Sequence, residues 1–154
     1  MATEIERKFL VRDASWRPGA SGTKYRQGYL CSEGGRTVRV RVAGEHAYLT
    51  IKGPRVGLAR PEFEYPVPVE DANQLLDGLC PRPFIEKVRY RIEYQGLVWE
   101  VDEFSGENQG LVLAEVELTH EAQPVALPPW IGEEVSEDPR YYNSNLARHP
   151  YTHW

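Results

Sequence analysis

Residues 4–11 read Glu-Ile-Glu-Arg-Lys-Phe-Leu-Val and place a charged side chain at every second position from Glu4 to Lys8. Side chains of a β-strand alternate between its two faces, so Glu4, Glu6 and Lys8 are expected to share one face. The opposite face carries apolar residues such as Phe9. This stretch therefore predicts a strand with one apolar face and one face of closely spaced charges.

The same two-residue alternation recurs along the chain, between segments of turn residues. Short connections that contain glycine, such as Gly34-Gly35 and Gln95-Gly96, separate several of these segments. Connections of this length favour antiparallel neighbours. The pattern predicts eight strands, over residues 3–12, 24–31, 36–43, 46–53, 60–68, 85–95, 97–104 and 111–119.

Two segments have helical spacing instead. Four apolar residues within 69–79 recur at helical intervals, which predicts a helix there. A second helix is predicted over 139–147, because Asp138 can cap it and Pro139 suits the first helical position. Since no repeat or long linker divides the sequence, we expect a single domain over residues 1–154.

Composition places the chain among globular proteins. Of its 154 residues 41% are hydrophobic and 27% are charged, which is the balance of neither a disordered chain nor a membrane protein. The formal net charge is −5, whereas binding to a nucleic-acid backbone depends on a surplus of Lys and Arg, so no nucleic-acid partner is expected. Because no apolar run could span a bilayer and no signal-peptide pattern is present, we expect a cytoplasmic protein without a membrane partner. The sequence leaves monomer and homodimer open.

Several common kinds of site have no support in the sequence. Cys31 and Cys80 form no C-x-x-C pair, so a metal cluster or disulfide framework is not expected, and we expect two buried or half-buried thiols. Neither a glycine-rich phosphate loop nor a recognisable serine nucleophile motif occurs. Phosphate chemistry would therefore have to come from charged side chains.

The charged faces of the predicted strands are sorted by sign. One such strand is explained by an ordinary solvent-facing side. The joint pattern indicates instead that the charged faces converge on an anionic ligand accompanied by divalent cations. Carboxylate oxygens are the ligands that Mg²⁺ and Mn²⁺ prefer, and Arg and Lys bind phosphate oxygens. The sorted sets are Glu4/Glu6, Arg39/Arg41, Glu62/Glu64, Lys87/Arg89/Arg91, Glu100/Asp102 and Glu115/Glu117.

These motifs occur in the order seen in a known family. Residues 4–8 fit the E-x-E-x-K signature of the CYTH or triphosphate tunnel metalloenzyme superfamily, and the chain most resembles short bacterial members that hydrolyse inorganic triphosphate. The resemblance implies a mainly β (α+β) fold, an eight-stranded antiparallel β-barrel with a charged tunnel inside and a few helices packed outside or closing one end. The later motifs are Arg39-Val40-Arg41, Thr50-Ile51-Lys52, Glu62-Phe63-Glu64, Lys87-Val88-Arg89-Tyr90, Glu100-Val101-Asp102 and Glu115-Val116-Glu117.

The resemblance also implies an activity and a role for each charged residue. It implies metal-dependent hydrolysis of a small-molecule triphosphate to pyrophosphate and orthophosphate, with Mg²⁺ or Mn²⁺ as cofactor. Arg91 and Glu93 are expected at the rim or surface instead. The implied catalytic residues are Glu4, Glu6, Lys8 and Lys52, and the implied substrate contacts are Lys8, Arg39, Arg41, Lys52, Lys87 and Arg89. The implied metal ligands are Glu4, Glu6 and Glu117 first, then Glu62, Glu64, Glu100, Asp102 and Glu115.

Two placements stay open from the sequence. Tyr25, Gln27 and Tyr29 share a face of the second strand, where they either line the tunnel or pack as ordinary polar aromatic neighbours. The terminal segment around residues 141–143 either plugs the tunnel, as the resemblance implies for some short members, or docks as an amphipathic helix.

Other functions remain as alternatives. The superfamily includes adenylyl cyclases and thiamine triphosphatases, and nucleoside triphosphates are a further substrate class, so the fold alone does not select the substrate. No base pocket is recognisable in the sequence, which favours inorganic triphosphate. A non-catalytic binder of polyphosphate or nucleotides would keep the cations without needing metal carboxylates. Because the chain keeps Glu4, Glu6, Glu115 and Glu117, catalysis is ranked first.

Overall fold

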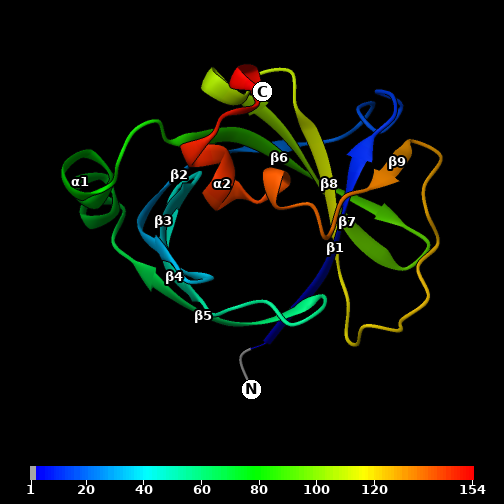
Figure 1. Cartoon of the computed structure of the whole chain (residues 1–154). Helices are drawn as coiled ribbons and strands as arrows, with labels where there is room; N and C mark the ends of the chain where they lie inside the picture. Colours follow the sequence, from blue (N-terminus) through cyan, green and yellow to red (C-terminus); the bar gives the residue numbers. More distant parts are fainter. Residues whose placement is uncertain (1–2) are drawn as a thin grey trace.

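The computed structural model describes residues 3–154, in which eight antiparallel strands form a closed ring and a ninth is added to β1 (Figure 1). Around the ring the order is β1-β5-β4-β3-β2-β6-β7-β8, and β8 pairs again with β1. Within the described residues, no helix has the length and apolar character needed to cross a membrane. The strands are β1 Thr3–Val11, β2 Gly22–Glu33, β3 Arg36–Ala43, β4 His46–Lys52, β5 Ala59–Val67, β6 Ile85–Tyr94, β7 Leu97–Ser105, β8 Val112–Glu117 and β9 Ile131–Glu134. The α-helices are α1 Val69–Leu79 and α2 Asn143–Arg148, and the 3-10 helices are η1 Gly106–Asn108, η2 Pro139–Tyr141 and η3 Tyr151–His153.

Strand β1 closes the ring. Its residues 6–10 pair with β8 along one edge, and its residues 3–5 pair with β5 along the other. On that second edge Phe9 and Val11 pair with β9. The first strand therefore joins the two ends of the sheet and also carries the added ninth strand.

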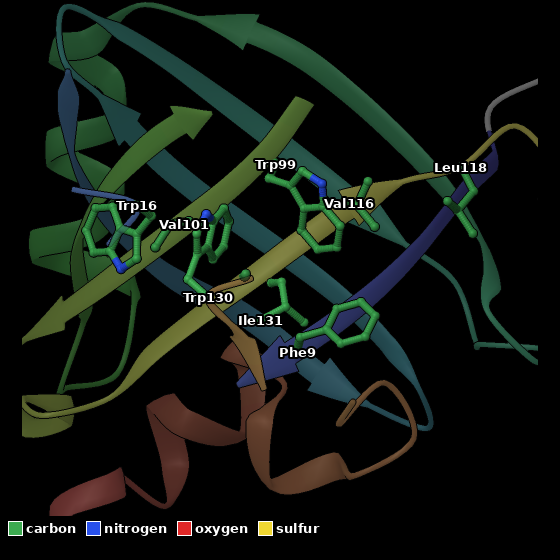
Figure 2. Close-up of a cluster of buried hydrophobic side chains, with 9 residues drawn as sticks. Phe9, Trp16, Trp99, Val101, Val116, Leu118, Trp130 and Ile131 are labelled. Atoms are coloured by element: carbon green, nitrogen blue, oxygen red, sulfur yellow. The ribbon is translucent and has the colours of Figure 1, made fainter. Parts of the chain in front are cut away.

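The apolar faces of the strands point out of the ring and are covered there. Helix α1 lies outside β2–β4, where Leu76 packs with Val40 in a buried cluster (Figure 1). Farther round, Phe9, Trp99 and Trp130 form the centre of a second cluster (Figure 2). The ring centroids of Phe9 and Trp99 are 5.5 Å apart, and those of Trp99 and Trp130 are 6.0 Å apart. Because these clusters hold the wall from outside, the inside of the ring is left to the charged faces.

The inward face changes from charged to apolar at one end of the ring. Leu146 of α2 has no exposed surface and packs against this apolar end together with Tyr141. The C-terminal segment therefore closes this end, which decides between the two placements left open by the sequence (Figure 1). On four strands the change occurs within two residues, from Lys8 to Leu10, from Glu115 to Leu113, from Lys87 to Ile85 and from Asp102 to Phe104.

The predicted helix over 139–147 is interrupted. The Asp138 carboxylate does cap its start by accepting a hydrogen bond from the Arg140 N–H, but the first turn is the 3-10 helix η2. Tyr142 is extended, with φ −70° and ψ 133°, and α2 begins only at Asn143. This break turns Tyr142 and Asn143 toward the interior of the ring, where both line a cavity.

Two smaller expectations are also corrected. Strand β9 was not predicted because the sequence Ile-Gly-Glu-Glu at 131–134 is too short to show alternation. It forms because β1 leaves an edge free, where Glu134 pairs with Phe9. Cys31 lies beyond a register shift in β2 and is exposed rather than buried, whereas Cys80 is buried as expected.

The packing of α2 into the ring makes Leu146 a sensitive position. Replacing Leu146 with Ala removes buried methyl groups and leaves a cavity, which should lower the free energy of unfolding by about 2–5 kcal/mol. Leu127→Ala is the control, since this side chain is 48% exposed and its loss should change stability by less than about 0.5 kcal/mol. Urea unfolding monitored by circular dichroism measures both. Equal small effects would show that α2 does not pack into the ring.

Candidate active site

A cavity of about 300 Å³ lies inside the ring. It is lined by polar and charged side chains from the strands and by Tyr142, Asn143 and Ser144 of the C-terminal segment. Every site residue predicted from the sequence lines it except Asp102. Those lining residues are Glu4, Glu6, Lys8, Arg39, Arg41, Lys52, Glu62, Glu64, Lys87, Arg89, Glu100, Glu115 and Glu117.

The strand register brings one group of carboxylates together. Glu6 of β1 lies directly opposite Glu117 of β8, and Lys8 lies opposite Glu115. Glu115 in turn lies opposite Glu100 of β7. Because directly opposite residues place their side chains on the same face, about 5 Å apart, four carboxylates from three strands share one part of the interior.

This carboxylate group carries more negative charge than its surroundings can balance. Burial, together with the charges of Glu115 and Glu4, raises the pKa of Glu6 well above its usual value. Burial also opposes ionisation of Glu115, but attraction to Lys8 and Arg89 leaves the pKa of that carboxyl well below its usual value. The negative charge of Glu115 therefore opposes ionisation of Glu6.

Asp102 lies behind the lining, as the counter-ion of two cations. Its Oδ1 accepts a hydrogen bond from Arg89 Nε at 2.7 Å, and its Oδ2 accepts from Arg89 Nη2 at 2.8 Å and from Lys87 Nζ at 2.7 Å. The side chain is only 1% exposed. Arg89 also donates to Glu115 Oε1 at 3.1 Å. Asp102 thus fixes the position of Lys87 and Arg89, and both of its oxygens are already engaged.

Lys87 is poised to change its charge near neutral pH. Burial lowers the pKa of its ammonium to about 7, because the attraction of Asp102 is offset by repulsion from Arg89 and Arg41. The Nζ atom also donates to Oδ1 of Asn143, at 3.0 Å. This bond ties the end-closing segment to the cationic part of the interior.

The surroundings of Arg41, like those of Lys87, contain too little negative charge to balance the cations. Burial, with repulsion from Arg39 and Arg89, lowers the pKa of Arg41 to about 10. Its Nε donates to Oε1 of the fully buried Gln27 at 2.7 Å. The ring of Tyr25 lies under both the Arg41 and Arg89 guanidinium groups, at 4.8 and 5.1 Å, where its π face attracts cations. Tyr25 and Gln27 therefore support the cations.

On the other side of the interior, cations and carboxylates pair directly. Lys52 Nζ donates to both oxygens of Glu4, at 2.9 and 3.0 Å, and lies 3.4 Å from Glu62 Oε2. Burial opposes ionisation of Glu4, but Lys52 lowers the pKa of this carboxyl on balance. Arg39 Nη2 lies 3.3 Å from Glu64 Oε2.

The sequence analysis missed several lining residues, among them Tyr48, Arg55 and Arg60. Arg60 and Tyr48 lie two positions before Glu62 and Thr50, on the same strand faces, so the alternation could have found them. Arg55 lies in the connection between β4 and β5, which has no alternation to mark it.

The residues expected at the rim are indeed outside the cavity. Arg91 is 68% exposed, and both Arg91 and Glu93 lie outside the lining. Tyr29 lies inside the lining together with Tyr25, so these two tyrosines face the interior.

The carboxylate group fits a divalent metal ion that arrives with an anionic ligand. Among residues 3–154, no three His, Cys, Asp or Glu side chains are placed to hold a metal ion by themselves. Mg²⁺, however, is usually held by one or two carboxylates, with substrate phosphates and water completing its shell. Glu6 and Glu117, which lie opposite each other in the β1–β8 register, form such a pair, and a bound cation would lower the raised pKa of Glu6.

Comparison with known proteins gives consistent matches along the chain. A family model described as CYTH domain matches residues 2–151. A protein of Acetivibrio thermocellus named inorganic triphosphatase is 50% identical over 151 residues, covering 98% of this chain and 97% of the relative. One of the same name from Nitrosomonas europaea is 40% identical over 150 residues, covering 94% and 97%. A crystal structure of an inorganic triphosphatase has a TM-score of 0.68 at 37% identity, covering 93% of this chain and 96% of that one.

The low pKa of Lys87 predicts proton uptake when an anion binds. At pH values between the lowered pKa of about 7 and the ordinary pKa of 10.5, Lys87 of the empty protein is mostly neutral. A phosphate anion beside Nζ favours the charged form and so raises this pKa. At a pH of about 8.5, metal-free binding of tripolyphosphate should therefore draw about one more proton from solution in the wild type than in Lys87→Met. Isothermal titration calorimetry in two buffers of different ionisation enthalpy measures the uptake. The same uptake in both proteins would contradict this assignment.

Proposed function

Because the chain belongs to the CYTH domain family, we propose that it is a metal-dependent triphosphatase that hydrolyses inorganic triphosphate to pyrophosphate and orthophosphate inside the ring. The observation that carries the proposal is the interior cavity, whose lining combines cations from β3, β4 and β6 with carboxylates from β1, β7 and β8. The name of the relative that is 50% identical supports inorganic triphosphate over a nucleotide or thiamine triphosphate as substrate.

The cationic lining binds the triphosphate. Arg39, Arg41 and Arg89 offer planar groups for phosphate oxygens, and Lys87 adds a compact charge. A pair of opposite unit charges about 4 Å apart gains roughly 4 kcal/mol at an effective dielectric near 20. The substrate also relieves the mutual repulsion that lowers the pKa of Arg41. Binding therefore supplies the negative charge that this part of the empty interior lacks.

The carboxylates hold the divalent metal ion that the family implies, and we assign it as Mg²⁺ or Mn²⁺. When bound, the metal ion stabilises charge on phosphate oxygens and lowers the pKa of a bound water molecule. Asp102 fits this role least, because it lies behind the cavity lining, is only 1% exposed and is bound by two cations, Arg89 and Lys87, through both of its oxygens. The first candidates for ligands are Glu4, Glu6 and Glu117, followed by Glu115, Glu62, Glu64 and Glu100.

Other side chains hold the reacting groups in place. Lys8 is almost fully buried, and its Nζ donates to the Tyr141 carbonyl oxygen at 3.1 Å, which fixes the ammonium at the closed end. Lys52 is fixed by Glu4. These two lysines stabilise charge on the phosphoryl group and on the leaving pyrophosphate.

We further propose that the chain works in the cytoplasm, as a monomer or homodimer and without a nucleic-acid or membrane partner. The net charge of −5 supports the lack of a nucleic-acid partner. A small-molecule substrate accounts for the interior site without any partner macromolecule.

The products identify the activity. Purified protein is incubated in parallel with tripolyphosphate, ATP and thiamine triphosphate, each with Mg²⁺ or Mn²⁺, and orthophosphate, pyrophosphate and cyclic nucleotide are quantified. We expect orthophosphate and pyrophosphate from tripolyphosphate, with lower rates on the other two substrates. Cyclic AMP from ATP would identify a cyclase, and binding of tripolyphosphate without any product would identify a binder.

Glu6→Gln separates catalysis from folding. Because burial and the charges of Glu115 and Glu4 disfavour the ionised form of Glu6, a neutral amide of nearly the same shape should leave the melting temperature nearly unchanged. Loss of the ionisable carboxylate should lower kcat for tripolyphosphate by about 100-fold or more. Glu93→Gln is the matched control, because Glu93 lies outside the cavity and its neutralisation should leave kcat unchanged. Wild-type turnover by Glu6→Gln would remove Glu6 from the proposed metal site.

A further inference from the structure

A second cavity, the side cavity, adjoins the tunnel cavity. It has a volume of about 450 Å³ and lies between the turn that joins β2 to β3, the connection from β4 to β5, and the C-terminal segment. The two cavities share part of their lining, so an ion bound there can contact residues of both cavities. The shared lining residues are Thr37, Arg55, Arg60, Tyr142 and Ser144.

The side cavity is rich in positive charge that no carboxylate pairs with. Arg55, Arg60 and Arg148 line it, and Glu33 is the one acidic residue among its lining residues within the described chain. None of these three arginines forms an ion pair within residues 3–154, whereas Arg89 pairs with several carboxylates. The wall of the side cavity therefore attracts an anion.

Arg55 and Arg60 are also held in place with hydrogen-bonding capacity to spare. Arg60 donates from Nε to the Gly53 carbonyl oxygen and from Nη2 to that of Gly35, both at 3.0 Å, so its guanidinium is fixed. Arg55 lies 4.8 Å from the centre of the Tyr142 ring, and its buried Nε has no hydrogen-bond partner. A buried donor without a partner is costly, and burial together with the charge of Arg55 lowers the pKa of Arg60. An anion between the two guanidinium groups would remove both penalties.

We propose that the side cavity is a second phosphate-binding site, which receives the orthophosphate released in the tunnel. The identity of this anion rests on the proposed triphosphatase activity. Guanidinium groups match the oxygens of a phosphate ion with paired hydrogen bonds. Arg55 and Arg60 face both cavities, and Arg148 lines the side cavity only. The product thus passes from the shared arginines to the outer one, away from the catalytic lining.

Calorimetry on the metal-free protein tests the side cavity. The tunnel is first saturated with tripolyphosphate, which is not hydrolysed without metal, and orthophosphate is then titrated in. We expect one further phosphate to bind, with a Kd raised about tenfold in Arg148→Gln and largely restored in Arg148→Lys. The Kd of tripolyphosphate should stay unchanged in Arg148→Gln. Arg36→Gln is the matched control, since Arg36 is the exposed first residue of β3 and lines neither cavity.

Three results would overturn the proposal. Orthophosphate could fail to bind the filled protein, or it could bind the wild type and Arg148→Gln equally well. Alternatively, Arg148→Gln could weaken tripolyphosphate binding as much as orthophosphate binding, which would make Arg148 part of the substrate site. If tripolyphosphate itself does not bind, the proposed function fails instead, and the same comparison of variants with orthophosphate alone still decides the side cavity.

Discussion

Buried charge is stable only beside opposite charge, and the interior of this ring is built around that constraint. Where the chain supplies both signs, they pair, as Lys52 does with Glu4 and as Arg89 does with Asp102. Where it does not, the pKa values shift: that of the Glu6 carboxyl is raised, and that of the Lys87 ammonium is lowered to about 7. The empty interior therefore lacks positive charge at one wall and negative charge at another. A metal-bound polyanion supplies both at once, which is the physical basis of the proposed specificity.

The wall can be charged inside because its stability comes from outside. In an ordinary small barrel the side chains that fill the interior form the core. Here the apolar faces point outward, where α1 covers β2–β4 and the cluster around Trp99 covers β1, β7 and β8. The interior contributes to the core only at the closed end, through Leu146 and its neighbours. Changes to the tunnel lining are thus largely separated from the packing that holds the fold.

Much of the site follows from alternation alone, because a period of two assigns each residue to a face and antiparallel register then brings the charged faces together. Depth along the tunnel is not encoded in that period, which is why Asp102 was predicted as a lining carboxylate like Glu100. Its neighbour Phe104 marks the start of the apolar end, where Asp102 is enclosed. Arg55 could not be found, because its position depends on the path of a connection. Tyr142 broke the predicted terminal helix because the segment must turn into the ring.

The closed end also sets the order in which the molecule can become functional. Lys8 in the first strand bonds to the carbonyl of Tyr141, 133 positions later, and Lys87 bonds to Asn143 in the same late segment. During synthesis these residues leave the ribosome long after β1 does. A growing chain can form much of the strand ring before then, but Lys8 and Lys87 do not yet have the C-terminal segment to bond to. Both lysines are therefore anchored only after the C-terminal segment has been made.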